Sequence, residues 1–486
     1  MGVSQFLFFK KRITLIARRN DEAIAKLLNN NESMGLLLQT KTLRERSARN
    51  EVQKTGMLPL IIFLVLLIIP NLSGCQGISP NIKTDNVIHL TLWQGVNPPP
   101  NRDVLQKLVD KFNQEHEDIE VESLYVGQPD QQMPKILSSV VGNAPPDLLW
   151  FNPTITGQLV ELDALFPIDE MLEKSPVKSE LDPALFGSME YNGRLWSVPF
   201  ATNNVAVFYR PSLFKAAGIT EIPKNWQEFR QAAKKLTRDT NGNGKIDQHG
   251  IFLPLGKGEF TVFIWLPFMW TAGGEFINAE VQSPAAVDLT QNQGAVSALQ
   301  LWQDLVKDNS AILSAPERGF ETNDFVKGKV AMQVTGPWTL TYITNDLSDG
   351  DFGVFPIPTK EKPATSIGGE NLFLFKTTPE RQKAAFKFAE YVVSQEFQTE
   401  WALGTGYLPA NLKSRQSQKY QQYLNQNPAS KIFLEQMEYG RSRPIFPGYS
   451  RVSENIGRAM ESVLLQKSSP QQALKESQQR LDLIFK

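Results

Sequence analysis

The chain has 486 residues, and its 50 Lys and Arg nearly balance its 51 Asp and Glu, which gives a formal net charge of −1 at pH 7. This balance gives no excess of positive charge of the kind that nucleic-acid-binding proteins carry. The single cysteine excludes an internal disulfide or a cysteine-based metal site, and the three histidines (His89, His116 and His249) do not fall at metal-ligand spacing.

The first feature along the chain is an apolar run, Leu58–Ile69, which is followed by small residues and by Cys75. The run is too short to span a bilayer, which takes roughly 20 residues, but it has the length of a signal-peptide core. The segment Leu72–Cys75 resembles the lipobox of bacterial lipoproteins. That resemblance implies cleavage before Cys75 and acylation of its thiol, which would anchor the protein to a lipid bilayer. A buried thiol in a short apolar helix is the less favoured alternative.

Residues 1–74 are therefore expected to be a signal peptide with an N-terminal extension, absent from the mature protein. Residues 75–86 are expected to form a lipidated tether. The basic segment Lys41–Lys54 suits the start of a signal peptide, but a long stretch precedes it. We expect translation to start later, for example at Met34. Such a protein would lie in the cell envelope, on the periplasmic side of the cytoplasmic membrane.

Beyond the tether, the hydrophobic pattern switches repeatedly between strand and helix. Alternation predicts a strand over 87–95, helical spacing predicts a helix over 102–119, and a second strand follows over 119–126. A helix over 133–143 and a strand over 146–152 complete a strand–helix repeat, which is typical of a parallel, doubly wound sheet. About 410 residues are too many for one ordinary core, so two domains are expected. Later strands are predicted over 203–210, 328–336, 351–358 and 371–376, and helices over 225–237, 291–306, 379–403, 452–465 and 469–485.

From Val87 onward the sequence resembles the extracellular solute-binding proteins of the maltose-binding type (family 1), the receptor subunits of bacterial ABC sugar importers. The stretches that carry the resemblance are "YNGRLWSVPFATNNVAVFYRPSLFKAAGI", "FVKGKVAMQVTGPWTL" and "SIGGENLFLF", in that order. It implies an α/β, two-lobed periplasmic-binding-protein fold (type II) with a ligand cleft between the lobes. It also implies a sugar or sugar-like ligand and ABC permease subunits as partners. By analogy, lobe 1 would comprise 86–201 plus 350–404, and lobe 2 would comprise 206–347 plus 409–486.

A sugar site needs aromatic platforms for the C–H faces and fixed polar groups for the hydroxyl rim. Open α/β sheets place such a site at the C-terminal ends of their strands. The resemblance marks Trp338 as the principal stacking residue, while Gly368 and Gly369 would let the backbone approach a ligand. The predicted ligand-binding residues are Trp93, Gln94, Phe151, Asn152, Asn203, Asn204, Trp270, Trp338, Gly368, Gly369, Glu370, Arg443 and Tyr449.

The other tryptophans near these segments favour a structural role. Trp150 lies within a predicted strand, and it is expected in the core, as are Trp196 and Trp265. For Trp270, a core position and a site position are equally favoured. Stacking is preferred for Trp338, because a Gly-Pro turn directly before it would present the ring.

The segment 239–250 resembles part of a calcium loop, with Asp239, Asn241, Asn243 and Asp247 at ligand positions. However, Gly250 stands where an EF-hand has its bidentate Glu, so any calcium site would be weak. A solvated turn of Asx and Gly residues is the favoured alternative. No other cofactor is expected.

These features predict a lipid-anchored binding protein, rather than an enzyme, that captures a sugar and delivers it to a membrane permease. A secreted carbohydrate-active enzyme would need two carboxylates flanking the bond, and Glu370 is the chief acidic candidate. The same fold with glycerol 3-phosphate or another polyol phosphate would call for clustered cations, and only Arg443 stands out. A sensor lipoprotein that reports to a receptor kinase also stays open.

Overall fold

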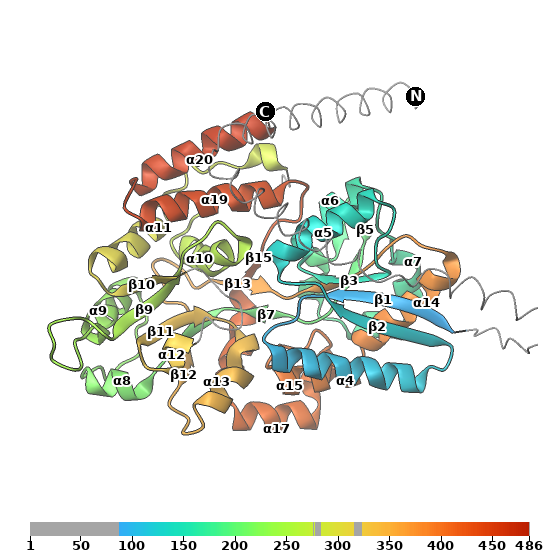
Figure 1. The fold of residues 1–486 in the computed structure, drawn as a ribbon, viewed down its shortest axis with the longest axis horizontal. Coiled ribbons are helices and arrows are strands. Elements are labelled where there is room, and N and C mark those ends of the chain that lie inside the picture. Colours follow the sequence, from blue (N-terminus) through green and yellow to red (C-terminus); the bar gives the residue numbers. More distant parts are fainter. Residues whose placement is uncertain (1–86, 276, 278–282, 315–322, 486) are drawn as a thin grey trace, which may run out of the picture. The chain divides into compact units, whose positions relative to one another are not determined.

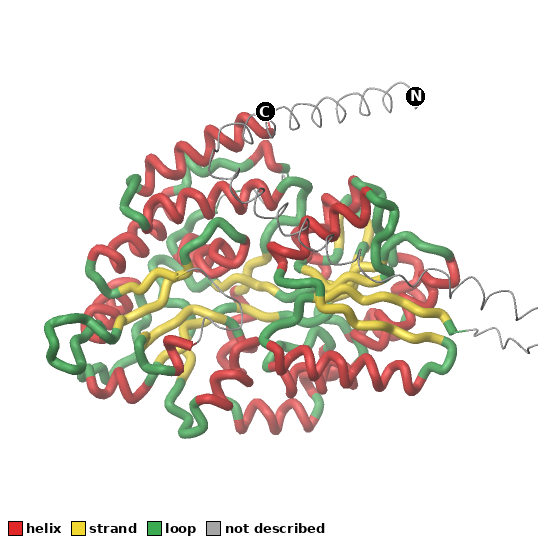
Figure 2. Tube along the Cα trace, in the orientation of Figure 1, coloured by secondary structure: helices red, strands yellow, loops and turns green. Residues whose placement is uncertain are grey.

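Two five-stranded sheets, each with its own hydrophobic core, form two lobes in the computed structural model (Figure 1). The predicted lipobox with Cys75 and the whole of the predicted signal and tether segments lie outside the described residues. Within the described part the α/β, two-lobed architecture is as predicted, with strands at the centre of each lobe and helices around them (Figure 2). The structure describes residues 87–275, 277, 283–314 and 323–485.

The sheet of the first lobe has the strand order β2-β1-β3-β14-β6. The predicted strand–helix repeat is confirmed, because β1 (Ile88–Gln94) pairs in parallel with β2 (Ile119–Tyr125) and β3 (Leu148–Phe151). The sheet is mixed rather than wholly parallel, since β14 (Asn371–Leu374) runs antiparallel to both β3 and β6 (Ser197–Pro199). Its described helices include α4 (Pro99–Glu115), α5 (Pro129–Val141), α6 (Thr156–Glu161), α7 (Asp169–Lys174), α14 (Pro379–Val392) and α15 (Gln395–Thr405), beside a small hairpin of β4 (Glu190–Tyr191) and β5 (Arg194–Leu195).

The sheet of the second lobe has the order β10-β9-β11-β8-β12. The strands β10 (Ala311–Ser314), β9 (His249–Pro254) and β11 (Val330–Thr335) are parallel, and β8 (Ala206–Tyr209) runs antiparallel to β11 and to β12 (Gly353–Phe355). The described helices that accompany it are α8 (Pro211–Ala216), α9 (Trp226–Leu236), α10 (Glu259–Thr271), α11 (Gln293–Lys307), α12 (Asn323–Val326), α13 (Leu340–Asp346), α18 (Pro428–Glu435), α19 (Tyr449–Leu464) and α20 (Pro470–Phe485).

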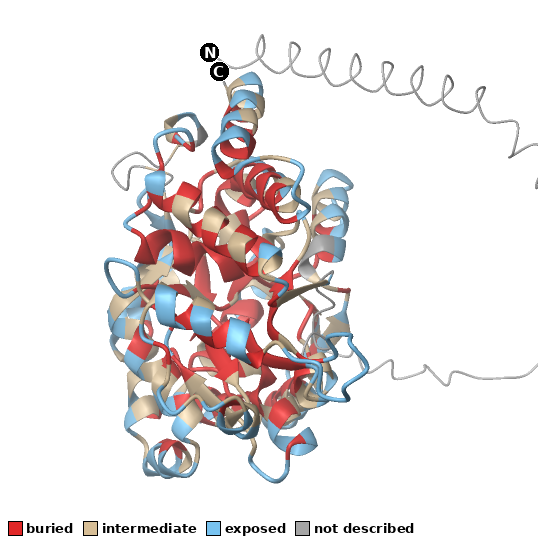
Figure 3. Ribbon diagram, turned by 90° about the vertical axis from the view of Figure 1, so that its left-hand side faces the viewer, coloured by how far each residue is buried: buried red, intermediate tan, exposed pale blue. Residues whose placement is uncertain are grey.

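Buried residues (red) gather in the interior of the molecule in Figure 3. The helix α10 is buried along nearly its whole length. Every residue from Phe260 to Thr271 is buried, and Trp265 and Trp270 belong to the core of the second lobe. A helix that is apolar all round has no polar face and hence no amphipathic period. This explains why the sequence pattern predicted no helix here, although the core position of Trp265 was expected.

A small three-stranded sheet connects the lobes, in the order β15-β13-β7. Here β13 (Thr365–Gly368) pairs in parallel with β15 (Gly440–Ser442) and antiparallel with β7 (Asn203–Asn204). The chain first crosses from one lobe to the other at β7, since β6 belongs to the first sheet and β8 to the second. The second crossing lies at β13, between β12 and β14.

The predicted boundary at 350 between lobes is wrong, because β12 pairs with β8 of the second sheet. Phe355, Ile357 and Ala364 also belong to the core of the second lobe. The chain therefore returns to the first lobe about 15 residues later than expected, at β13.

The predicted boundary at 409 is also early. Helices α16 (Leu412–Gln416) and α17 (Gln418–Gln426) stay with the first lobe, where Arg415 pairs with Asp182 at 2.6 Å. Tyr420 of α17 packs with Ala402 of α15. The second lobe is reached at α18, whose Phe433 ring lies 5.8 Å from that of Phe208 in β8.

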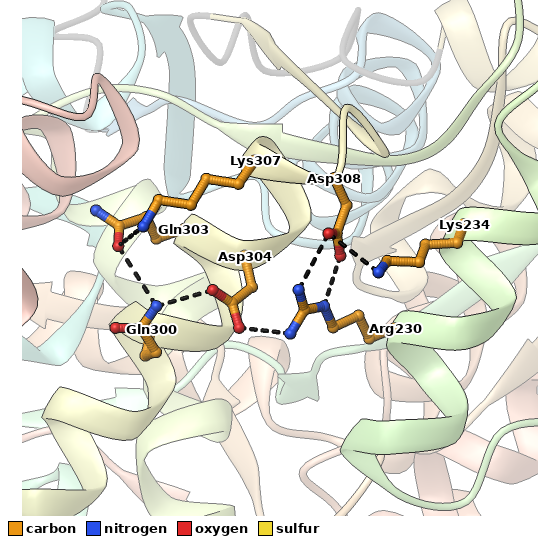
Figure 4. Close-up of polar contacts among 7 residues, drawn as sticks. All are labelled: Arg230, Lys234, Gln300, Gln303, Asp304, Lys307 and Asp308. Atoms are coloured by element: carbon orange, nitrogen blue, oxygen red, sulfur yellow. Dashed lines mark hydrogen bonds and ion pairs between the residues drawn. The ribbon is translucent and has the colours of Figure 1, made fainter.

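An ion-pair network on the second lobe joins α9 to α11 (Figure 4). The guanidinium of Arg230 donates to Asp308 through Nε at 2.5 Å and to Asp304 at 2.6 Å, and Lys234 adds a contact of 3.1 Å to Asp308. Hydrogen bonding to Arg230 is the main reason why the pKa of Asp308 is lowered. The network fixes the two helices to each other, and none of its residues lines the cleft described next.

Candidate functional site

A cleft with about 650 Å³ of space not filled by atoms, open solvent included, lies where elements of both lobes and the connecting sheet meet. The C-terminal ends of β1 and β3 contribute from the first lobe, as expected for an open α/β sheet. The N-terminus of α10 and the 3-10 turn η6 (Pro337–Thr339) contribute from the second. The lining residues are Gly95, Asn97, Gln128, Trp150, Asn152, Asn203, Glu259, Phe260, Phe263, Trp338, Gly368, Gly369, Glu370, Tyr407 and Arg443.

Trp338 is one of the aromatic residues of the lining. It is only partly buried and packs against the cores of both lobes. Its ring lies directly over Gly336, where an added Cβ would come within 1.9 Å of the indole. The ring of Phe263 lies 6.4 Å away, tilted by 39°. The glycine before the turn therefore makes room for an indole whose remaining surface faces the cleft, as a stacking platform requires.

Asn203 is the polar group of the lining that most needs a partner. The residue is 3% exposed, and its Oδ1 atom has no hydrogen-bond partner among the described residues. A buried acceptor without a partner costs roughly 1–3 kcal/mol. A hydroxyl group donated by a bound ligand would remove this cost.

Gly368 and Gly369 line the cleft, and close packing is a further reason for the missing Cβ atoms, beside the predicted approach of a ligand. A Cβ on Gly368 would lie 2.4 Å from Oδ1 of Asn203, and one on Gly369 would lie 2.3 Å from the carbonyl oxygen of Ala201. Gly369 also has a φ of +115°, which disfavours other residues. Gly368 thus packs closely against β7, and Gly369 packs against the backbone of the two residues before that strand.

A charged pair closes one side of the cleft. Arg443 donates from a guanidinium NH group to Oε1 of Glu259 at 2.6 Å, and its Cζ atom lies 4.5 Å from the centre of the Phe263 ring. Beneath the pair, Tyr449 donates to Glu259 at 3.3 Å, and Ser453 donates to the other carboxylate oxygen. Burial, assisted by the nearby charge of Glu259, raises the pKa of Tyr449 well above its usual value, so the phenol stays a donor.

Seven of the predicted ligand contacts line this cleft, and six do not. Those in the lining are Asn152, Asn203, Trp338, Gly368, Gly369, Glu370 and Arg443. Those outside it are Trp93, Gln94, Phe151, Asn204, Trp270 and Tyr449.

The four strand residues outside the lining have other contacts. Trp93 and Phe151 pack in the core on the far face of the first sheet. Gln94 is buried and accepts from the backbone N–H of Val96 at 2.9 Å. Asn204 points behind the crossing, where it donates to the carbonyl of Phe433 at 2.7 Å and accepts from Gln436 at 3.0 Å.

The other two misplaced residues lie in the second core. Trp270, for which a site and a core position were equally favoured, is 2% exposed and packs among α10 neighbours. Tyr449 is 1% exposed and reaches the cleft only through Glu259. Trp150, expected to be core, is buried and yet also reaches the lining.

Several lining residues were not predicted from the sequence. Glu259, Phe260 and Phe263 share one face of the first turns of α10, a helix without a usable period. The sequence has one signal for the start of this helix: Gly258 stands directly before the acidic Glu259 and an apolar run. The remaining unpredicted residues come from strand ends and loops: Gly95, Asn97, Gln128 and Tyr407.

The segment 239–250 forms an exposed turn in which the carboxylates accept from their own loop. Asp239 accepts from the backbone N–H of Gly242 at 2.7 Å, and Asp247 accepts from that of Thr240 at 2.8 Å and from Asn241 at 2.7 Å. These contacts are those of the solvated Asx and Gly turn. Within the described residues, no group of three or more His, Cys, Asp or Glu side chains is placed to hold a metal ion. Weak calcium binding here stays a prediction.

Two α/β lobes with a cleft between them define the class of two-lobed solute-binding proteins. Residues 107–428 match the bacterial extracellular solute-binding protein family, and the chain belongs to it. None of the helices in the described part of the chain is long and apolar enough to cross a membrane.

Individual relatives differ in the ligands that their names give. The chain is 24% identical over 329 residues to the maltotriose-binding protein of Pyrococcus abyssi, covering 66% of each. It is 23% identical over 409 residues to the sn-glycerol-3-phosphate-binding periplasmic protein UgpB of Pectobacterium atrosepticum, covering 80% of this chain and 90% of the relative. The maltose/maltodextrin-binding domain MalE of Bdellovibrio bacteriovorus, solved with maltotriose, is 26% identical with a TM-score of 0.69, covering 82% of this chain and 99% of that chain.

Proposed function

We propose that this protein is the substrate-binding subunit of an ABC importer and that it captures an uncharged sugar in the cleft between its lobes. The observation that carries the choice of ligand is the composition of the lining. It combines exposed indole surface at Trp338 with the unpartnered acceptor of Asn203. Aromatic faces and fixed polar groups are what a sugar's C–H faces and hydroxyl rim require.

Relatives named for maltotriose and for glycerol 3-phosphate leave two ligand classes to consider. A phosphate ligand calls for unpaired Arg or Lys groups. Among the described residues that line the cleft, Arg443 is the one cationic side chain, and it is paired with Glu259. This pairing supports the sugar over the polyol phosphate.

An enzyme that cleaves glycosides is the second candidate, because Glu259 and Glu370 both line the cleft. Both carboxylate oxygens of Glu259 accept hydrogen bonds within the protein, from Arg443, Tyr449 and Ser453, whereas a catalytic acid or base has to reach the bond that is cleaved. We therefore propose binding without chemistry. Incubation of a bound sugar with the pure protein should return it unchanged.

The binding test is a thermal-shift screen across neutral sugars, maltose and maltotriose included, with glycerol 3-phosphate in parallel. A ligand at 100 times its dissociation constant should add about 2.7 kcal/mol to the free energy of unfolding. Because Trp338 lines the cleft, the same ligand should also change the tryptophan fluorescence. Stabilisation by glycerol 3-phosphate, with no response to any sugar, would contradict the proposal.

The location proposed for this function is the periplasmic side of the cytoplasmic membrane, with an acylated Cys75 as the anchor and the permease subunits as partners. The family consists of extracellular solute-binding proteins, and this supports a location on the outer side of the membrane. The lipobox-like segment Leu72–Cys75 supports the anchor. More than one acyl chain is needed for stable anchoring.

Replacing Cys75 with alanine should abolish lipidation, because the chain has no other cysteine thiol to accept the lipid. We expect unprocessed precursor or released protein in place of the membrane-bound form. Metabolic labelling with a fatty acid and membrane fractionation would measure both effects. Ser73→Ala is a matched control that keeps a small residue in the segment and should be processed normally. Equal labelling and retention of the Cys75→Ala variant would refute the anchor.

A further inference from the structure

The positive charge of Arg443, in the lining of the cleft, is neutralised by an ion pair with Glu259. Arg443 and Glu259 have side chains that are 7% and 16% exposed, and their charged atoms lie 2.6 Å apart. The face of Phe263 lies against the guanidinium at 4.5 Å. The positive charge of Arg443 is therefore present in the lining but has its partner within the protein.

The carboxylate of Glu259 is fixed independently of Arg443. Tyr449 and Ser453, both buried in α19, donate to its two oxygens from the side away from the cleft. Glu259 also begins α10, where the helix dipole favours a negative charge. A ligand that approached Arg443 would consequently meet a carboxylate that is held in place.

This arrangement has opposite consequences for neutral and anionic ligands. A neutral hydroxyl group can donate to Glu259 or accept from Arg443 without breaking the pair. A phosphate or carboxylate group would have to share Arg443 with an anion that is held by two further donors. Glu370 adds a second carboxylate to the same lining.

We propose that Glu259 determines specificity by excluding phosphorylated and other anionic ligands, so that the cleft selects uncharged polyols. This inference rests on the proposed function, in that the cleft is the ligand site. It assigns a repulsive element, and such elements discriminate between ligands as effectively as attractive ones.

The test replaces Glu259 with glutamine, which keeps the shape of the side chain and removes its charge. Isothermal titration with inorganic phosphate and with glycerol 3-phosphate should show at least about tenfold tighter binding to E259Q than to wild type, equivalent to 1.4 kcal/mol. Adding Arg443→Met to E259Q should remove this gain, because the freed guanidinium is its source.

The matched control is Glu275→Gln, which frees Arg441 in the neighbouring pair Arg441–Glu275. Neither residue lines the cleft, so this variant should bind phosphate no better than wild type. An equal gain in both variants would show a nonspecific effect of charge and overturn the proposal.

Wild-type protein keeps the proposal falsifiable even if E259Q does not fold. Binding of glycerol 3-phosphate by wild type as tight as that of any neutral sugar would overturn it, as would an E259Q variant that folds and gains nothing. If E259Q gains anion binding while wild type binds no sugar, the role of Glu259 stands and the proposed function falls.

Discussion

Replacing Trp338 with alanine is expected to weaken sugar binding roughly 30- to 150-fold. Stacking one sugar face on the indole removes on the order of 100 Å² of apolar surface from water, worth about 2–3 kcal/mol at 25 cal/mol/Å², and each 1.4 kcal/mol is tenfold in affinity. Because η6 and both cores already hold the ring, little further entropy is lost on binding. Isothermal titration measures the ratio of dissociation constants.

Trp196→Ala is the matched control for this change. Trp196 is also partly buried, but it packs against the far core of the first lobe and donates to the carbonyl of Tyr191 at 2.8 Å. It is absent from the cleft lining. Its loss should lower stability and leave the affinity of the folded protein within about threefold of wild type. A Trp338→Ala variant within threefold of wild type, with Trp196→Ala weaker, would place the site elsewhere.

The largest expected effect on stability is that of Trp265→Ala, at about 3–5 kcal/mol. Trp265 is 1% exposed at the centre of the buried helix α10. Its Nε1 atom has no hydrogen-bond partner among the described residues, so the effect arises from packing. Urea unfolding should show the loss in the transition of the second lobe. The melting temperature should fall by roughly 6–20 °C for a domain of this size.

Trp226→Ala is the control for this prediction, because Trp226 is only partly buried at the start of α9. It should cost less than Trp265→Ala. If the two lobes unfold separately, only the second transition should move, and each transition has to be fitted on its own. A loss below about 1 kcal/mol for Trp265→Ala would contradict the assigned core.

Periodicity predicted most of the strands and helices, because each amphipathic element has one polar face. It failed at α10, where no polar face exists. The lobe boundaries failed for a different reason. Nothing in the pattern of the strand β12 indicates whether it pairs with β8 or returns to the first sheet, since pairing is decided by distant residues.

The sequence predicted that the site lies at the ends of the strands. It did not predict which side chains at those ends point into the cleft. Trp150 and Phe151 are adjacent in β3, and Asn203 and Asn204 are adjacent in β7, yet one member of each pair lines the cleft and the other does not. Both faces of these strands are buried, so the sequence shows no alternation between polar and apolar residues. The pairing of Glu259 with Arg443 joins segments 184 positions apart, which local patterns cannot reveal.

The most direct test of the account is a titration calorimetry series with the purified protein, a panel of neutral sugars and glycerol 3-phosphate. We expect one neutral sugar to bind saturably with one site per chain, to be recovered unchanged, and to lose most of its affinity in Trp338→Ala. Tight binding of glycerol 3-phosphate with no sugar response, or cleavage of the sugar by wild-type protein, would contradict a cleft built for uncharged sugars.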